Sequence, residues 1–160
     1  MYVVERVANH PAFEALFLCG SFATGRADEV SDIDFIASIA DGRFEEAWEQ
    51  RSTLIPGDAL LAWDRRSDPE RELGAIKFLS RDVVKVELSF ATMAGQNLLA
   101  DPFIVLLGEE MTAERFERRG PIPADELEAY ALRLRKEGKV PEVEMHYGDL
   151  MRAIRAAKNG

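Results

Sequence analysis

Cysteine and long hydrophobic runs are both scarce in this sequence, and their scarcity excludes two classes of protein. The chain has one cysteine, Cys19, so an internal disulfide cannot form and stability must come from packing. The longest apolar runs, such as residues 103–107, are far too short to cross a bilayer. Charged residues and Pro11 interrupt the N-terminal segment, so it does not resemble a signal peptide. We expect a soluble, cytoplasmic protein without a membrane partner.

Positive charge is scarce as well. Lysine and arginine number 20 against 29 aspartates and glutamates, which gives a net charge of −9. A protein that binds long nucleic acid gains affinity from a basic surface, because that surface releases counterions from the phosphate backbone. Long nucleic acid is therefore not an expected partner. A single nucleotide remains possible, since metal ions and a few local cations can hold its phosphates.

The rest of the composition is that of a folded protein. The 160 residues are 47% hydrophobic and 31% charged, which suffices to bury a core. We expect a core domain over residues 1–120 and a C-terminal helical extension over residues 121–160 that packs on the core. Within the extension, the hydrophobic pattern predicts helices at residues 125–137 and 142–158.

Hydrophobic patterning along the first 120 residues predicts strands mixed with helices. Residues 1–8 fit either a short helix or a strand, residues 43–54 fit a helix, and residues 64–72 fit a charged loop. The charged segment 109–119 fits a solvated helix. Apolar runs predict strands at residues 15–19, 31–38, 59–63, 73–79, 83–90 and 103–107, with a hairpin joining the fourth and fifth. This order predicts an α+β fold, with a short mixed sheet backed by helices.

One segment combines a glycine-serine turn with two closely spaced aspartates. The apolar run at residues 16–19 ends at Gly20-Ser21, where backbone N–H groups and a hydroxyl can approach an anion closely. Ten residues later, Asp32 and Asp34 alternate with apolar residues, so both carboxylates leave the same face of a strand. Two such carboxylates repel each other unless a cation lies between them. Their hard oxygen atoms favour Mg²⁺ or Mn²⁺.

This pattern, apolar-Gly-Ser followed by Asp-apolar-Asp-apolar, resembles the signature of the DNA polymerase β-like nucleotidyltransferase superfamily. That superfamily includes antibiotic nucleotidyltransferases and the minimal nucleotidyltransferases of bacterial toxin–antitoxin pairs. The resemblance covers residues 16–36, and we see no family motif after residue 90. It implies a polymerase β-like fold and an enzyme that moves a nucleoside monophosphate, expected to be AMP from ATP, onto a hydroxyl. It also implies two Mg²⁺ ions, or Mn²⁺, and a triphosphate tail held by Gly20 and Ser21.

The family pattern requires a third acid from a later strand, and Glu87 is the candidate. In the predicted strand at residues 83–90, Lys85, Glu87 and Ser89 share the face opposite to the apolar residues. By resemblance, Glu87 would be a metal ligand or the general base that deprotonates the acceptor hydroxyl. Asp82 is the alternative third acid, but it falls in the predicted turn. Taken singly, each acid also fits an ordinary solvated strand face.

Two cations near these acids, Arg26 and Lys85, are candidates for neutralising phosphate charge, although each also fits an ordinary surface position. The spacing of Gly20 and Gly25 matches a P-loop, but Arg26-Ala27 follows where that motif requires lysine and a hydroxyl residue. A P-loop is therefore excluded. Cys19 lies in an apolar strand and is expected to be a small buried side chain, not a nucleophile.

The sequence does not identify the acceptor. A small molecule such as an aminoglycoside-like cation suits an acidic protein, and a partner protein is the other expected acceptor. Because the chain is short, a second subunit, as in a homodimer, could supply the acceptor-binding half. The competing hypothesis is a binding module with little or no turnover, either antitoxin-like or nucleotide-sensing. An antitoxin-like module would hold a helical partner protein, and the amphipathic C-terminal helices support this reading.

Overall fold

The computed structural model describes residues 2–68, 72–92, 98–100, 102–108 and 117–119. The chain divides into two units, Met1–Gly120 and Pro121–Gly160, and every described residue lies in the first. The two helices predicted within the C-terminal unit thus lie outside the described residues. In the described part, no helix is long and apolar enough to cross a membrane.

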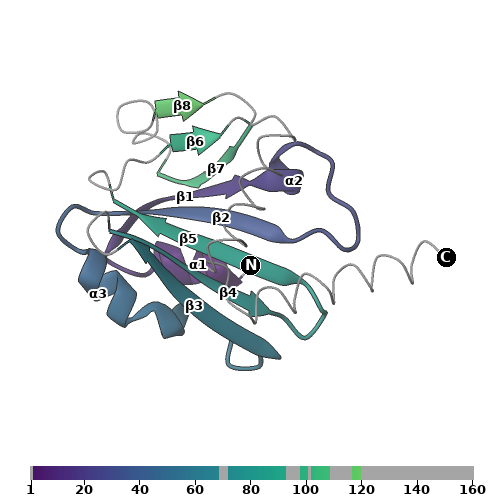
Figure 1. The fold of residues 1–160 in the computed structure, drawn as a ribbon, viewed down its shortest axis with the longest axis horizontal. Coiled ribbons are helices and arrows are strands. Elements are labelled where there is room, and N and C mark those ends of the chain that lie inside the picture. Colours follow the sequence, from purple (N-terminus) through teal and green to yellow (C-terminus); the bar gives the residue numbers. More distant parts are fainter. Residues whose placement is uncertain (1, 69–71, 93–97, 101, 109–116, 120–160) are drawn as a thin grey trace, which may run out of the picture. The chain divides into compact units, whose positions relative to one another are not determined.

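A six-stranded mixed sheet forms the centre of the first unit (Figure 1). Strands β2 and β5 run parallel, and the other neighbours in this sheet run antiparallel. The predicted α+β class with a mixed sheet is therefore confirmed. In spatial order the strands are β3 (Leu61–Asp68), β4 (Leu73–Leu79), β5 (Lys85–Ala91), β2 (Ile33–Ile39), β1 (Phe13–Cys19) and β7 (Ile104–Leu107).

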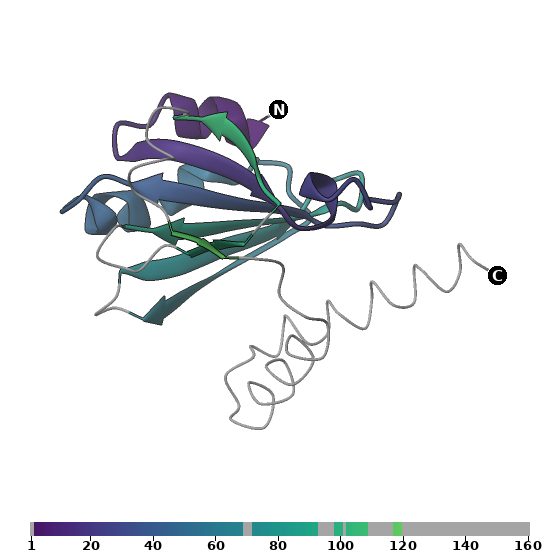
Figure 2. The same ribbon diagram turned by 90° about the horizontal axis from the view of Figure 1, so that it is seen from above.

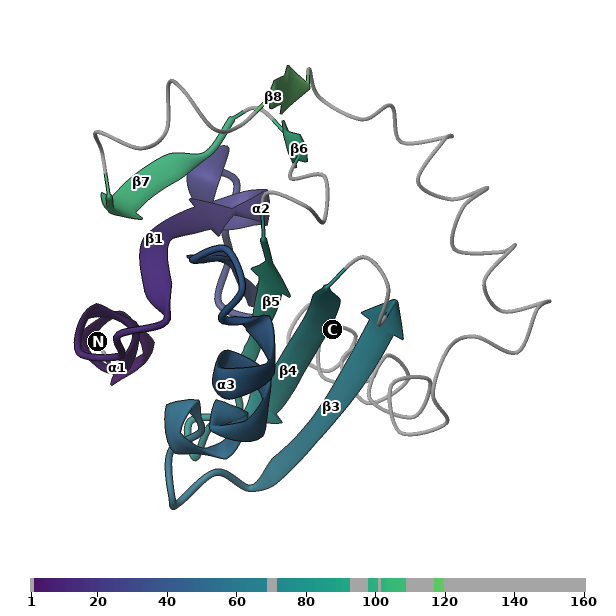
Figure 3. The same cartoon turned by 90° about the vertical axis from the view of Figure 1, so that its left-hand side faces the viewer.

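The helical segments are short. Helices α1 (Tyr2–Ala8) and α3 (Phe44–Glu49), together with a 3₁₀ turn at Arg51–Leu54, pack on one face of the sheet (Figure 3). Helix α2 (Gly20–Ala23) follows β1 at the opposite end of the sheet from α3 (Figures 1 and 2). The ambiguous N-terminal segment is thus a helix.

The predicted helix at residues 43–54 is interrupted near its middle. Helix α3 ends at Glu49, and the following residues tighten into the 3₁₀ turn. Backbone N–H groups at this helix end bond to the carbonyl oxygens of Glu46 and Trp48. Nη1 of Arg51 also donates to the carbonyl oxygen of Trp48 at 2.8 Å, and its guanidinium lies 4.6 Å from the centre of the Trp48 ring.

Alternating apolar side chains fix which face of each central strand is buried. Val86, Leu88 and Phe90 of β5 point into the core with Phe35 of β2, under α1 and α3. The intervening residues of β5 therefore face the other side of the sheet.

The core also needs space for the ring of Trp48, which lies against Gly74. A Cβ at that glycine would stand 2.3 Å from the ring, so a larger residue there would displace the tryptophan.

Two further segments differ from the sequence prediction. The predicted charged loop at residues 64–72 is wrong over its first half, because β3 continues to Asp68 as an edge strand. Its polar side chains bond to the helices: Asp64 accepts from Arg51 Nε at 2.9 Å, and Arg66 pairs with Glu45. An edge strand that carries charges gives no hydrophobic alternation to recognise.

The second difference concerns the segment predicted as a solvated helix. Its last residues, Glu117–Arg119, form strand β8, which pairs in parallel with β6 (Leu98–Ala100) in a separate two-stranded sheet. The remainder of that segment, 109–116, lies outside the described residues. Neither three-residue strand is long enough to show a two-residue period in the sequence.

Candidate active site

The glycine-serine turn lies where β1 leaves the core and enters α2. Gly20 has a φ of +66°, a left-handed conformation that a residue with a side chain adopts at a cost. It also lies tightly against β2, because a Cβ at Gly20 would stand 2.3 Å from Oδ2 of Asp34. Both the backbone turn and the close approach therefore require glycine. The backbone of the turn and the second aspartate of the motif are in contact.

Strand register brings five side chains into one line across the sheet. Asp34 of β2 pairs with Cys19 of β1 on one side and with Glu87 of β5 on the other. Glu87 in turn pairs with Lys77 of β4, and Lys77 pairs with Trp63 of β3. Directly opposed residues in neighbouring strands share a face. All five residues therefore lie on the face opposite to α1 and α3.

Two lysines pair with the acids of this face. Lys77 Nζ lies 3.0 Å from Oε2 of Glu87, and only 8% of Lys77 is exposed. Lys85 Nζ lies 3.0 Å from Oδ2 of Asp32 and 3.8 Å from Oε2 of Glu87. The two ammonium groups thus face three carboxylates, those of Asp32, Asp34 and Glu87. Ionised together, these five groups carry one net negative charge.

This arrangement changes the acidity of Asp34. Its pKa is raised from 3.8 to about 6, first by burial and then by the negative charges of Asp32 and Glu87. Lys85 and Lys77 lower it by a smaller amount. Burial and like charges both disfavour an ionised carboxyl, and their combination is frequent at functional sites.

Cys19 shares this negative environment. Burial, and next the charge of Asp34, raise the pKa of its thiol from 9.0 to about 11. A thiol with such a pKa carries almost no thiolate at neutral pH, and the thiolate is the nucleophilic form. This agrees with the expectation that Cys19 is not a nucleophile.

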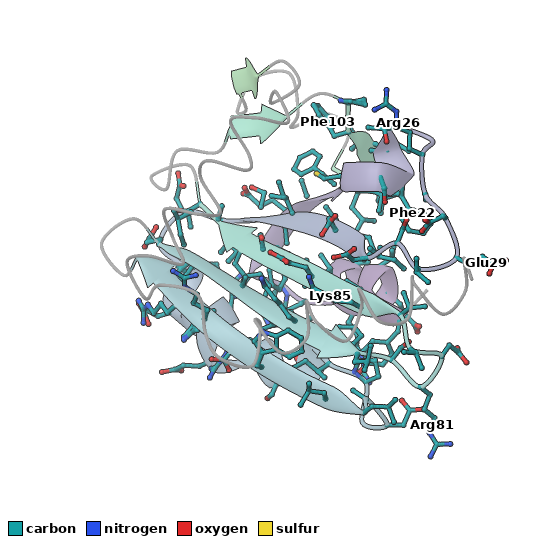
Figure 4. The ribbon with its side chains drawn as sticks, turned by 45° about the vertical axis from the view of Figure 1, so that its right-hand side comes forward. Phe22, Arg26, Glu29, Arg81, Lys85 and Phe103 are labelled. Atoms are coloured by element: carbon teal, nitrogen blue, oxygen red, sulfur yellow. The ribbon has the colours of Figure 1, made fainter. Side chains whose placement is uncertain are left out.

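Of the other residues considered for the site, Ser21 lies beside the acids, whereas Arg26 and Asp82 do not. Ser21 is in the first turn of α2, next to Gly20, and its carbonyl oxygen accepts the N–H of Arg26 at 2.9 Å. The side chain of Arg26 is exposed beside α2 and lies well away from Lys85 (Figure 4). Asp82 is exposed in the turn between β4 and β5. The structure thus groups Gly20, Asp32, Asp34, Lys85 and Glu87, with Ser21 adjacent.

The donors suit a hard cation, although they do not form a finished cage. Among the described residues, no three histidine, cysteine or acidic side chains stand together closely enough to hold a metal ion as they are. The chemistry of the site nevertheless fits Mg²⁺ or Mn²⁺, because carboxylate oxygens are the ligands these ions prefer. Burial first, and then the charges of Asp32 and Glu87, raise the pKa of Asp34, and a cation beside it would favour the ionised carboxylate.

Lys77 is the residue of this site that sequence reasoning missed. It lies within the apolar segment Leu73–Leu79, where a lone lysine gives no motif. The available signal was its position: a lysine within a strand that reads as buried requires a partner acid. Once β4 and β5 are aligned as a hairpin, Glu87 lies directly opposite.

Comparison with known proteins adds no assignment. No family model matches the chain, and no curated protein matches it in sequence. A function for the chain must therefore be inferred from its site residues.

Proposed function

We propose that the chain is a divalent-metal-dependent nucleotidyltransferase with a polymerase β-like fold. One observation carries the proposal: the parallel register of β2 and β5 sets Glu87 beside Asp34, on the face where Lys85 contacts Asp32, next to the Gly20-Ser21 turn. A strand-turn-helix that ends in glycine and serine, two aspartates on the following strand and a third acid on a neighbouring strand are the parts such an enzyme needs.

Each part has a role in the reaction. The N–H of Gly20 and the hydroxyl of Ser21 would bind phosphate oxygens of a nucleoside triphosphate, with ATP the expected donor. Asp32 and Asp34 would hold Mg²⁺, which supplies charge neutralisation at the phosphates. Glu87 would complete the set as a further ligand or as the base that takes the acceptor proton. Lys77 holds the carboxylate of Glu87 in place from the neighbouring strand.

The reaction is an exchange of one phosphorus–oxygen bond for another. An acceptor hydroxyl gives up its proton to a carboxylate, and its oxygen forms a bond to the α-phosphorus. The bond from the α-phosphorus to the oxygen that bridges to the β-phosphorus breaks, and pyrophosphate leaves with that bonding pair. The acceptor, a small molecule or a partner protein, ends as a nucleoside monophosphate ester.

Calorimetric titration of ATP, with and without Mg²⁺, tests the proposal. The wild type should bind ATP only with the metal, and Asp32→Asn/Asp34→Asn should lose this binding, because it removes two carboxylates of the site. Asp58→Asn/Asp82→Asn is the matched control, since it removes two exposed carboxylates outside the site and should bind as the wild type does. Failure of the wild type to bind any nucleoside triphosphate would overturn the proposal.

A screen for transfer of labelled AMP would follow a positive titration. Incorporation of label into an acceptor, absent in the double mutant, would support the enzyme. Metal-dependent ATP binding without transfer to any acceptor would instead favour the nucleotide-sensing module.

A further inference from the structure

The Lys85 ammonium lies between two of the three carboxylates. Its Nζ is 3.0 Å from Oδ2 of Asp32 and 3.8 Å from Oε2 of Glu87. The side chain is 12% exposed, so this cation is largely withdrawn from water and held by the site. Lys85 opens β5 and lies two residues before Glu87, on the same face of the strand.

The second lysine has a different position. Lys77 reaches Glu87 from β4, on the side of Glu87 away from β2, because the strand order is β4-β5-β2. Lys77 can therefore stay paired with Glu87 while a ligand occupies the side that faces Asp32 and Asp34. Lys85 cannot, because the space it fills is the space between Asp32 and Glu87.

An ammonium group and a metal ion compete for such a space. A magnesium ion bonded to Asp32 at about 2.0–2.1 Å, with its other ligands around it, needs the space between Asp32 and Glu87 that the ammonium fills. The two positive charges would also repel each other. Lysine has a long flexible stem, so its head group can leave without any movement of the strand.

We infer that Lys85 is an internal counterion that occupies the position a metal would take and must be displaced when a divalent cation binds Asp32. This inference rests on the proposed function, since it takes Asp32 as a metal ligand. It follows that the site binds a metal ion alone only weakly. A triphosphate would favour metal entry, because its oxygens offer the displaced ammonium a new partner, and metal and nucleotide would then bind cooperatively.

Binding of Mn²⁺ in the absence of nucleotide tests the inference, with free Mn²⁺ measured by electron paramagnetic resonance. Titrations at pH 8 keep Asp34 ionised, since its pKa is about 6. Lys85→Met removes the competing charge, so it should bind Mn²⁺ about tenfold more tightly than the wild type, or better. Lys85→Gln gives a second neutral variant in case the first does not fold, and Lys85→Arg should bind as weakly as the wild type.

Arg81→Met is the matched control. Arg81 lies in the β4–β5 turn that precedes Lys85, but its side chain is 75% exposed and points away from the site (Figure 4). Removing its charge should leave Mn²⁺ affinity unchanged. A similar gain in Arg81→Met would mean that net charge, and not occupancy of the metal position, sets the affinity, and would overturn the inference.

The remaining outcomes separate this inference from the proposed function. If the wild type and both neutral variants bind Mn²⁺ equally, or if the neutral variants bind it more weakly, Lys85 is not a competitor and the proposed function stands. If no variant binds Mn²⁺ and ATP titration with Mg²⁺ also fails, both are overturned.

Discussion

Asp34 should make the metal-free protein less stable than it would be with a neutral side chain at this position. Its carboxylate is partly buried beside Asp32 and Glu87, and its pKa in the folded protein is raised from 3.8 to about 6. The folded state therefore binds the proton more tightly than the unfolded chain does. The contribution of Asp34 to stability is greatest below about pH 4, falls as the pH rises towards 6, and levels off above that.

The size of the effect follows from the same values. Each pH unit between the two pKa values is worth about 1.4 kcal/mol, so the gap corresponds to about 3 kcal/mol. Because the side chain is only partly buried, solvent screening reduces this figure, and we expect about 1–3 kcal/mol. Asp34→Asn should therefore raise the free energy of unfolding by that amount at pH 8, while it removes a predicted metal ligand.

Urea denaturation in the presence of EDTA, followed by circular dichroism at pH 8, 7, 6 and 5, measures this gain. The gain of Asp34→Asn over the wild type should fall by about half between pH 8 and pH 5. Asp58→Asn is the control, because it removes a carboxylate that is 68% exposed and should change stability by less than about 0.5 kcal/mol. A variant no more stable than the wild type at pH 8, or a gain independent of pH, would refute the reasoning.

Two further predictions concern the neighbours of Asp34. Gly20→Ala should lower the free energy of unfolding by about 2–4 kcal/mol and abolish Mg²⁺-dependent ATP binding, because its Cβ meets Asp34 at 2.3 Å. Gly25→Ala is the control, because Gly25 has a φ of +69° and no atom lies within 4 Å of the new Cβ. It should lower the free energy of unfolding by only about 1 kcal/mol and keep ATP binding. If both variants lost equal stability in urea titration and equal ATP affinity in calorimetry, crowding against Asp34 would not be the cause. Cys19, with its thiol pKa raised to about 11, should react with Ellman's reagent at pH 8 about 100-fold more slowly in the folded protein than in the urea-unfolded chain. Similar rates in the two states would show that the thiol is not shielded.

The sequence predicted the faces of the strands better than it predicted their neighbours. Alternation in β2 and β5 put Asp34 and Glu87 on the polar side of their strands, and the structure has both on the face opposite to α1 and α3. Periodicity carries this information because successive side chains in a strand point to opposite faces. It does not say which strands pair, so the direct opposition of Asp34 and Glu87 could not be read from spacing.

Partners from other strands were the least predictable part of the site. Lys77 stands between apolar residues, and its function in the site depends on the register of a hairpin. Arg26 was wrongly placed for a different reason. It follows Gly20 and Ser21 closely in the sequence, so it was expected to lie near the acids in space as well. Helix α2 turns the backbone after Ser21, and Arg26 ends on the exposed side of that turn.

The parallel pairing of β2 with β5 has a consequence for how the protein folds. Strands β3, β4 and β5 form an up-and-down meander of near neighbours, and β1 and β2 form a separate antiparallel pair. Contacts between distant parts of a chain close long loops and form at an entropic cost. The β2–β5 pairing, which sets Ile33 opposite Val86, is such a contact, and we call it the seam between the β1–β2 half and the β3–β5 half.

The candidate site lies across that seam, since Asp32 and Asp34 belong to one half and Lys85 and Glu87 to the other. Neither half contains the three carboxylates by itself, so the site comes into existence only when the whole sheet closes. The Lys85–Asp32 ion pair crosses the seam and helps to join the halves, whereas repulsion between Asp34 and Glu87 opposes their joining. A cation bound by carboxylates from both halves would stabilise the β2–β5 pairing, and formation of that pairing would in turn favour cation binding.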